Sequence, residues 1–537
     1  MDIHRMLGLV LVLVLLVAPG GAAPVVALPS AEASALAQVS AVVQVAAAPA
    51  GNVIYAASCS QGDVQNAIDA ASDGDFVVVP AGACAWTTPP GDDSVPAISI
   101  DGKGITLQGA GIGQTVITDA TGTGWNNSLI RVDGVEGKPF RITGFSIRKA
   151  GTVTTGIAIH GDCKNFRVDQ NEFDSDDGYT SIYVSGYTYG VIDHNYFING
   201  RVLVFESLAG DESWQSPLTL GSANAVYVED NYYYSDVFST NAIDSNGGAR
   251  WVFRYNMVVN TYCEAHGLQN AGQRGTFSYE LYENTFTTAD NPRTNWVAFY
   301  TRGGTGVLFN NAVINAAGNP YNDFAAVQDN RSCGLASTHW GACDGTSPCD
   351  GNTPGMSGYP CRDQVGRSTD FSDTEVHPQA LEPLYAWNNT FDGSPVAIES
   401  RDICDLSLEH VVEGRDFING VRPGYLPYVY PHPLTWELDL TGTPGNETAR
   451  LSWTVHAYLF PTSTWRIDYY TTTATAPMTA TDPFSITRAY MLTGLTNYQW
   501  YTVTLNAIVD STPILTDTVR VMPTDIVVHL PLLLKED

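Results

Sequence analysis

A three-residue motif recurs along the chain: an Asn, any residue, and then an aromatic or aliphatic residue. The gaps between successive Asn residues are 24, 36, 25, 28, 27 and 78 residues. A near-constant period of about 25 residues is typical of a solenoid that forms one coil per repeat. The Asn residues that mark the coils are Asn171, Asn195, Asn231, Asn256, Asn284, Asn311 and Asn389.

The repeated residues have a structural explanation that involves no chemistry. Short segments of three to six alternating apolar and polar residues precede each Asn, as expected for strands. Stacked Asn side chains can satisfy each other's amides in a ladder at a turn. We expect the aromatic or aliphatic residue two positions later to point inward and stack on its counterpart.

Charge and length limit the classes of function. The chain has 537 residues, with 26 basic and 56 acidic side chains and a net charge of -30. Nucleic acid is not expected as a partner, because phosphate binding needs a basic footprint. An acidic polysaccharide would be repelled unless Arg side chains or a bound cation create a local positive field.

The first residues resemble a secretion signal. Arg5 precedes an apolar run over 6–18, which is too short to span a bilayer comfortably, and small residues follow. We assign residues 1–27 to a signal peptide and 28–54 to a linker. This predicts a secreted or cell-surface protein with no membrane span in the mature chain.

Nine cysteines fit an oxidising compartment. Cys59 and Cys84 are expected to pair. Four more cysteines crowd into one segment, where two further disulfides are expected and the spacing fits a zinc site poorly. These four are Cys333, Cys343, Cys349 and Cys361.

A cap to the solenoid is expected at its start. Residues 63–72 have helical periodicity, with Asp63 as the expected N-cap, and an apolar strand follows over 76–79. The run Cys59-Ser-Gln-Gly-Asp-Val-Gln-Asn-Ala-Ile-Asp, followed by Gly74-Asp-Phe-Val-Val-Val-Pro80, is similar to the entry into the right-handed parallel β-helix of the pectate-lyase-like superfamily. The resemblance implies an all-β chain with a solenoid over about 55–430. It does not specify an activity, because this fold hosts lyases, hydrolases, esterases, epimerases and non-catalytic adhesins.

Two later segments depart from the repeat. Residues 318–378 are rich in Gly, Pro, Asp and Cys and are interpreted as a disulfide-rich loop insertion. Residues 434–525 contain strand-like segments, and Leu495 followed by Tyr501-Thr-Val503 resembles the tyrosine corner of a fibronectin type III domain. We therefore predict a C-terminal β-sandwich, followed by an apolar tail over 526–537.

Counting from the marker Asn residues predicts one polar cluster. Asp244, Arg274 and Arg302 stand 12, 10 and 9 residues before the next marker, so we expect them on one face of successive coils. Glu206 and His266 stand 11 and 10 residues after the preceding marker, in a neighbouring column.

These side chains suit β-elimination of a uronate polymer. A base must remove the proton next to the carboxylate, and a cation must stabilise the developing negative charge. His266 is the candidate base, and Arg274 and Arg302 are candidates for neutralising the carboxylate. Asp244 and Glu206 are candidates for holding calcium or orienting His266. Three aromatic residues are candidates for stacking on sugar rings: Trp214, Trp296 and Tyr300.

The leading hypothesis is a secreted bacterial polysaccharide lyase that acts as a monomer. The Arg-x-x-Pro-x-x-Arg segment of calcium-dependent lyases is absent from the sequence, so enzyme activity is not established by motif. The alternatives are a non-catalytic cell-surface or glycan-binding protein, and a glycoside hydrolase or esterase. The lyase hypothesis expects the cluster to line an open, aromatic-edged face, whereas the binding hypothesis expects its members to pair with each other.

Overall fold

The computed structural model describes residues 51–525 apart from short internal segments. The expected signal peptide, most of the linker and the apolar tail therefore lie outside the described residues, as does most of the 318–378 insertion. The internal segments left out are 88–94, 122–127, 150–154, 209, 238–240, 269–273, 290–296, 318–319, 329–361, 370–378, 402–410, 437, 456–463, 472–477, 483–488 and 510–511.

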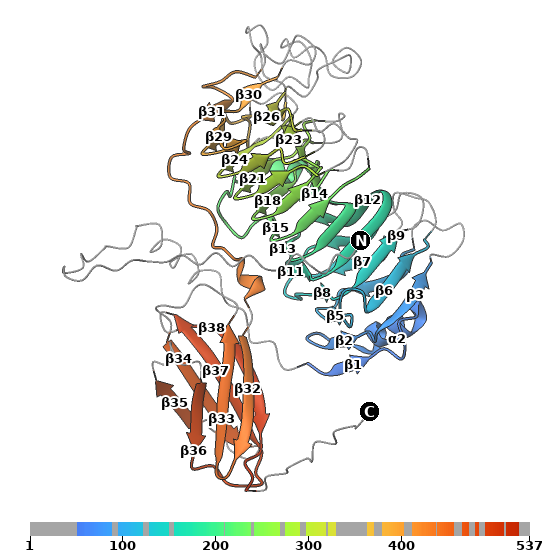
Figure 1. Ribbon diagram of the computed structural model, residues 1–537, viewed down its shortest axis with the longest axis vertical. Coiled ribbons are helices and arrows are strands. Elements are labelled where there is room, and N and C mark those ends of the chain that lie inside the picture. The colour runs from blue at the N-terminus through green and yellow to red at the C-terminus, as the bar shows by residue number, and fades with distance from the viewer. Residues whose placement is uncertain are drawn as a thin grey trace, which may run out of the picture.

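The N-terminal part is a right-handed parallel β-helix, as the repeat predicts (Figure 1). One of its sheets has 12 parallel strands in chain order. Its strands are β1 (Val53–Tyr55), β2 (Phe76–Val78), β5 (Thr106–Gln108), β8 (Arg141–Thr143), β11 (Lys164–Asp169), β13 (Tyr189–Asp193), β15 (Val226–Glu229), β18 (Arg250–Arg254), β21 (Ser278–Tyr282), β24 (Thr305–Phe309), β27 (Leu384–Trp387) and β31 (Phe417–Asn419).

The other sheet of the solenoid has 19 strands, which form two ladders joined through the long strands β12 and β14. The first ladder follows the Asn turns and comprises β3 (Gly82–Trp86), β6 (Thr115–Asp119), β9 (Ser146–Lys149), β12 (Glu172–Gly186), β14 (Tyr196–Ser207), β16 (Tyr232–Tyr234), β19 (Met257–Val259), β22 (Thr285–Thr287), β25 (Ala312–Ile314), β28 (Thr390–Phe391) and the antiparallel β29 (Ser394–Pro395). The second ladder comprises β4 (Ile98–Asp101), β7 (Ser128–Gly134), β10 (Thr155–Gly161), the later parts of β12 and β14, β17 (Ile243–Ser245), β20 (Cys263–Ala265), β23 (Val297–Thr301), β26 (Asp323–Val327) and β30 (Glu399–Ser400).

The seven marker Asn residues form a continuous ladder of buried hydrogen bonds. Each Nδ2 donates to Oδ1 of the next marker at 2.9–3.2 Å, and each Oδ1 also accepts from the backbone N–H of the marker before it. Asn311 and Asn389 are bonded in the same way, although 78 residues separate them. The insertion therefore leaves the coil and returns to it without breaking the stack.

The aromatic column also stacks as expected. The rings of Phe173, Phe197 and Tyr233 lie nearly parallel, with centroids 5.1 and 4.5 Å apart. They belong to one apolar core that runs through the solenoid. The pleat explains the pattern, because alternate residues of each strand point to this core and to the outside.

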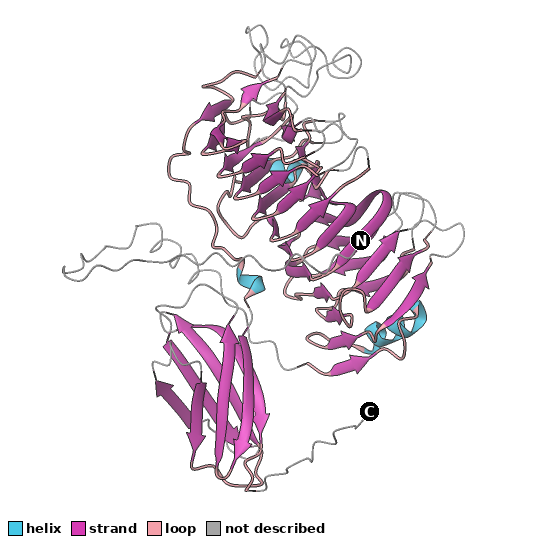
Figure 2. Ribbon diagram, viewed as in Figure 1, coloured by secondary structure: helices cyan, strands magenta, loops and turns pink. Residues whose placement is uncertain are grey.

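Helix α2 (Gln61–Ala70) covers the first coil, two residues earlier than expected (Figure 2). Its N-cap is Ser60, whose Oγ accepts from the backbone N–H of Asp63, so the expectation that Asp63 caps the helix was wrong. Asp63 instead accepts a hydrogen bond from Ser58. A Ser in the extended conformation satisfies a free helical N–H as well as an Asp does.

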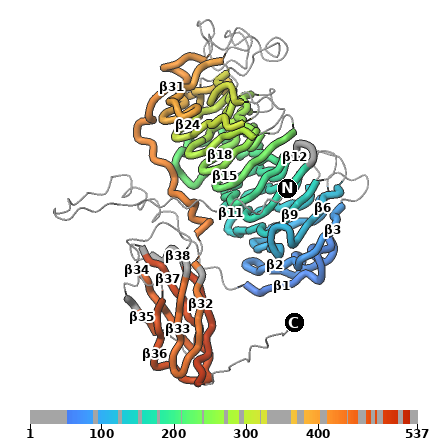
Figure 3. The backbone as a smooth tube through the Cα atoms, viewed as in Figure 1, coloured from blue at the N-terminus to red at the C-terminus, as the bar shows by residue number. Residues whose placement is uncertain are grey.

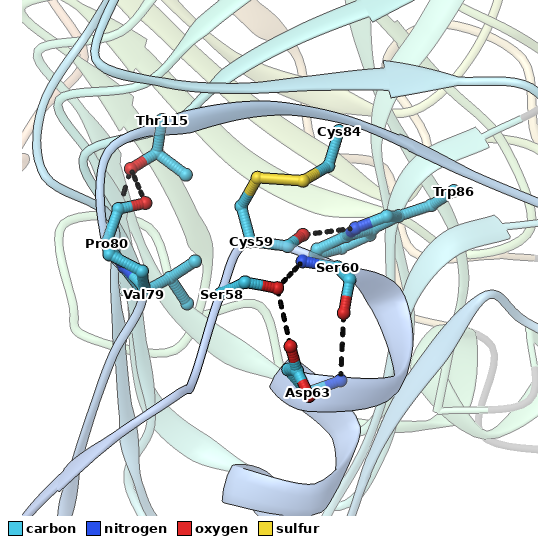
Figure 4. The surroundings of a disulfide bond; sticks show 9 residues. All are labelled: Ser58, Cys59, Ser60, Asp63, Val79, Pro80, Cys84, Trp86 and Thr115. Atoms are coloured by element: carbon cyan, nitrogen blue, oxygen red, sulfur yellow. Dashed lines mark hydrogen bonds between the residues drawn. A yellow bond between two sulfur atoms is a disulfide. The ribbon is translucent and has the colours of Figure 1, made fainter.

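The predicted Cys59–Cys84 disulfide is present beside this helix (Figure 4). Trp86 donates its indole N–H to the carbonyl oxygen of Cys59, which fixes the disulfide against the core. Among the described cysteines, Cys163 and Cys263 are buried and unpaired. The other predicted disulfide cysteines lie outside the described residues.

The C-terminal part is a sandwich of two antiparallel sheets. A three-stranded sheet contains β32 (Leu438–Gly445), β33 (Thr448–Val455) and β36 (Ala489–Thr493). A four-stranded sheet contains β35 (Met478–Asp482), β34 (Thr464–Thr471), β37 (Tyr501–Val509) and β38 (Thr512–Val521). Tyr501 accepts a hydrogen bond from the backbone N–H of Thr496 at 3.0 Å, which is the kind of contact that a tyrosine corner makes.

The segment 420–436 joins the two parts along the outer face of the 12-stranded sheet (Figure 3). It includes the 3₁₀ helix η2 (Pro433–Thr435). Arg254 donates to the carbonyl oxygens of Tyr428 and Val429, while Glu229 accepts from the backbone N–H of His432. In the described part of the chain, no helix is long and apolar enough to cross a membrane.

Candidate functional site

A polar cluster occupies the outer face of the second ladder, where three successive coils contribute β17, β20 and β23. Ile243 pairs with Cys263, and both side chains are buried in the core. Asp244 and Glu264, one residue further along, therefore point outward from neighbouring strands. Tyr300 is the register partner of Glu264 on the next coil.

His266 lies at the centre of this cluster. It follows β20, and its backbone N–H donates to the carbonyl oxygen of Ser245. Its Nε2 lies 2.8 Å from Oε1 of Glu264 and 3.2 Å from Oδ1 of Asp244. Two carboxylates therefore share the hydrogen on Nε2.

Arg302 approaches the other ring nitrogen of His266. Its Nη2 lies 2.7 Å from Nδ1 and 3.0 Å from Oε1 of Glu264. A guanidinium has only hydrogens to offer, so this contact is a hydrogen bond only when Nδ1 carries a lone pair. The arrangement therefore corresponds to the neutral tautomer of His266 with its hydrogen on Nε2.

Two further polar groups and one ring complete the cluster. Arg201 donates to Oδ2 of Asp244 at 3.3 Å, and Asn241 donates to Oε2 of Glu264 at 3.3 Å. The guanidinium of Arg302 also lies over the ring of Tyr300, 5.3 Å from its centroid. We call the set Arg201, Asn241, Asp244, Glu264, His266, Tyr300 and Arg302 the His266 cluster.

Neighbouring charges make His266 more basic than a free imidazole. Burial lowers its pKa, but the hydrogen bonds and charges of Asp244 and Glu264 outweigh burial and raise the pKa to about 9. Burial also opposes ionisation of Asp244, but His266 and Arg201 together keep the pKa of Asp244 below its ordinary value. The carboxylates thus favour a proton on Nδ1, while Arg302 occupies the place where that proton would go.

Three members of the cluster could also hold a metal ion. Ligand atoms of Asp244, Glu264 and His266 all lie within 4.8 Å of one another. One imidazole nitrogen with two carboxylates suits a zinc- or manganese-type ion better than calcium, which takes oxygen ligands. Arg201 and Arg302 already neutralise both carboxylates, which weakens attraction for any cation.

Sequence counting brought some predicted residues together and not others. Asp244, His266, Arg302 and Tyr300 meet in the cluster. Glu206 is exposed on the outside and is not one of the three grouped candidate ligands. Trp296 lies outside the described residues.

Arg274 lies outside the cluster and holds another segment in place. Its guanidinium makes two 2.8 Å hydrogen bonds to the buried carboxylate of Asp363 and a third to Asp211. Asp363 also accepts from the backbone N–H of Gly275 and from Gln379. The stretch 362–369, which follows the cysteine-rich segment, is thereby fixed beside Gly304, whose backbone N–H donates to the carbonyl oxygen of Asp363.

Trp214 is fully buried and offers no surface for a sugar. It belongs to the short helix α3 (Asp211–Gln215), and its indole N–H donates to the carbonyl oxygen of Gly275. The Arg274 guanidinium lies 4.9 Å from the centre of its ring. Trp214 and Arg274 therefore form part of one packed structural unit.

Arg201, Asn241 and Glu264 were missed by the sequence analysis. Glu264 stands two residues before His266, so strand alternation places it on the same outer face as the imidazole. That spacing was the signal that could have found it. Arg201 and Asn241 carried no comparable signal, because the loops that separate them from the cluster differ in length.

Comparisons with known proteins add little. No protein family matches the chain, and no curated protein matches its sequence. Among solved structures, the A-module of the mannuronan C-5 epimerase AlgE4 from Azotobacter vinelandii is similar at 14% sequence identity and a TM-score of 0.22. The match covers 49% of this chain and 92% of that module. A likeness this weak carries no argument, so the architecture rests on the strand pairings and the function on the His266 cluster.

Proposed function

We propose that this protein cleaves an acidic polysaccharide by β-elimination at the His266 cluster. One observation supports the proposal: the imidazole of His266 contacts two carboxylates through Nε2 and a guanidinium through Nδ1. β-Elimination of a uronate needs a base for the proton next to the carboxylate and a cation for the carboxylate itself. The cluster presents both on the outer face of the solenoid.

Arg302 would move from His266 to the substrate. The uronate carboxylate is a stronger partner for a guanidinium than a neutral imidazole, because both partners are charged. When Arg302 moves away, the lone pair of His266 Nδ1 is exposed, and it takes the proton from the carbon next to the substrate carboxylate. Asp244 and Glu264 then stabilise the imidazolium through Nε2, in the manner of a carboxylate behind a catalytic His.

The electrons of that carbon–hydrogen bond form a carbon–carbon double bond, and the bond to the glycosidic oxygen breaks. The leaving oxygen takes up a proton from water and the His266 imidazolium returns its proton to the solvent, so one chain becomes two with no net addition of water. The Arg302 guanidinium lies over the ring of Tyr300. In this proposal the Tyr300 ring either stacks on the sugar or positions Arg302.

A divalent cation is the alternative to the Arg side chains as the source of positive charge in the proposed reaction. Calcium was the expectation from the sequence, but the donors that meet are Asp244, Glu264 and His266, which favour a zinc- or manganese-type ion. A bound divalent cation would supply the positive charge that neutralises the uronate carboxylate. The paired Arg side chains supply that charge without a metal, so we propose that activity persists in a chelator.

A non-catalytic glycan-binding role is the second candidate, and one observation favours it. The members of the cluster pair with each other, which is what the binding hypothesis expects. In that case the Arg side chains would bind a uronate carboxylate with no proton transfer. The two candidates therefore differ in turnover and not in the class of ligand.

We also propose a secreted protein whose sandwich is a fibronectin type III-like module. The Cys59–Cys84 disulfide supports an oxidising compartment. The division into three- and four-stranded antiparallel sheets, together with the Tyr501 contact, supports the module. Secretion is tested by N-terminal sequencing of protein recovered outside the cell, which should begin beyond residue 27.

The enzyme proposal is tested by ultraviolet absorbance of the unsaturated uronate, with a panel of uronic-acid polysaccharides and with or without a chelator. We expect a rise with wild-type protein and a loss of at least about 100-fold in His266→Ala and Arg302→Ala, the lower range for removal of a general base. Arg148→Ala is the matched control, because Arg148 is an exposed side chain on the first ladder, where it pairs with Glu172. A flat trace from folded wild-type protein on every polymer would instead support the binding role.

A further inference from the structure

The outer face of the four-stranded sheet of the sandwich carries exposed aromatic rings at one end. Trp500 is 46% exposed and Tyr470 is 38% exposed. Trp500 directly precedes β37, and Tyr470 lies near the end of β34. Large exposed rings that gather on one part of a surface are typical of binding sites.

Strand register places Tyr470 in one row with Arg520, and Trp500 stands two residues before the middle member of that row. Tyr470 pairs with Thr502, and Thr502 pairs with Arg520 on β38. Tyr501, Val503 and Val521, which alternate with them, are buried between the sheets. Tyr470, Thr502 and Arg520 therefore face solvent, with about 4.8 Å between neighbouring strands.

Arg520 holds the Trp500 ring in place. Its guanidinium lies 5.1 Å from the ring centroid, close enough for a cation–π contact. The guanidinium therefore lies against one face of the indole. A rigid ring loses little conformational freedom on binding, which favours its use as a platform.

The rest of the same face is polar and internally bonded. Thr504 pairs with Thr518, and Asp468 accepts from Asn506 and Thr479. The aromatic residues are thus confined to the end where Arg520 also lies. Rings beside a single cation match a sugar ring that bears a carboxylate, because the ring stacks and the carboxylate pairs with the guanidinium.

We propose that Trp500, Tyr470 and Arg520 bind an acidic polysaccharide, separately from the His266 cluster. The class of ligand rests on the proposed function of that cluster; the existence of the platform does not. The platform would hold the polymer near the solenoid and raise the effective concentration of cleavable bonds.

The experiment is affinity electrophoresis of the full chain through gels containing an acidic polysaccharide. Both the wild type and the His266→Ala variant are used, so that turnover does not alter the gel. We expect Trp500→Ala to weaken retention about tenfold, and Arg520→Gln to weaken it more on acidic than on neutral polymers. Met478→Ala, which removes another exposed apolar side chain of the same sheet at 45% exposure, should leave retention unchanged.

The outcomes separate the two proposals. Retention that depends on Trp500 would uphold the platform, and if the wild-type protein also shows no turnover of the retained polymers, the same result would count against the lyase. Equal retention of wild type and Trp500→Ala, with unchanged thermal unfolding, would overturn the platform. Self-association that Trp500→Ala abolishes would also overturn it, because a second copy of the chain would then be the occupant.

Discussion

The imidazole of His266 is held between groups of opposite charge. Asp244 and Glu264 at Nε2 raise its pKa to about 9, and Arg302 donates to the lone pair of Nδ1 in the arrangement observed. A base of high pKa, once it is unprotonated, suits the removal of a weakly acidic proton. The candidate role of His266 as base remains a prediction, and the geometry supplies a way for it to act.

The pH dependence of activity tests this residue. If unprotonated His266 is the base, kcat/KM should rise with pH along a limb near pH 9. Asp244→Asn removes one carboxylate and should move the limb about one pH unit or more toward lower pH. Asp101→Asn, an exposed carboxylate on β4 of the same ladder, should leave it in place. A limb that Asp244→Asn does not move would contradict the proposed charge pairing.

The free energy of unfolding should also depend on the protonation of His266. It should fall as the pH rises, whereas kcat/KM should rise. The pKa of His266 is raised from 6.5 to about 9 in the folded protein. Its protonation therefore stabilises the fold fully below about pH 6.5, and this contribution is lost as the pH rises through about 9. Urea denaturation should show a fall in the free energy of unfolding across this range that is smaller in His266→Gln. An identical fall in both proteins would assign it to other groups.

At the scale of elements, the Asn ladder and the Arg274–Asp363 contact show what sequence can and cannot predict. The ladder was predictable because each marker Asn performs the same local task in every coil. The site was only partly predictable, because coils differ in length and counting from a marker loses register. The 36-residue interval from Asn195 to Asn231 contains α3, and the Arg274 side chain is held by Asp363 from a distant part of the chain. Neither effect leaves a local pattern.

The ladder makes a stability prediction. Asn256 donates to the Val228 and Arg254 carbonyls and to Asn284, and it accepts from Asn231. Asn256→Ala leaves several buried groups without partners, so we expect a loss of more than about 3 kcal/mol in chemical denaturation. Met257→Ala, at an exposed neighbouring position, should change stability by less than about 0.5 kcal/mol. A loss of similar size in both variants would argue against the ladder as a source of stability.

The structure also separates Arg274 from the chemistry. Arg274→Ala leaves the buried carboxylate of Asp363 uncompensated, and we expect a loss of about 3–5 kcal/mol in stability. Protein that remains folded should keep the wild-type pH limb, because Arg274 is not a member of the His266 cluster. If Arg274→Ala instead lost activity at unchanged stability, Arg274 would have to be assigned to the active site.

At the scale of the molecule, a buried ion pair ties the segment 420–436 to the solenoid. Arg254 and Glu229 are both fully buried, and together they bond three backbone groups of that segment. Arg254 is further enclosed by the rings of Tyr227 and Tyr430. The segment that leads to the sandwich is therefore packed as part of the solenoid and not as a free linker.

Disruption of this pair should release the segment. Arg254→Ala leaves Glu229 buried without its charged partner, which we expect to cost about 3–5 kcal/mol and to expose 420–436 to limited proteolysis. Arg466→Ala, which removes a partly exposed pair with Asp468 in the sandwich, is the control and should change neither property strongly. Resistance of Arg254→Ala to cleavage at wild-type levels would show that other contacts hold the segment.

Mass spectrometry of the products formed in ¹⁸O-labelled water distinguishes β-elimination at the His266 cluster from hydrolysis. β-Elimination adds no water, so we predict shorter chains that carry an unsaturated end, with no heavy oxygen beyond the amount that a reducing end exchanges with the labelled water, and that are not formed by His266→Ala. Products without an unsaturated end, heavier by one water molecule, would show hydrolysis instead. Intact polymer after incubation with folded protein would contradict catalysis and leave glycan binding as the role of the His266 cluster.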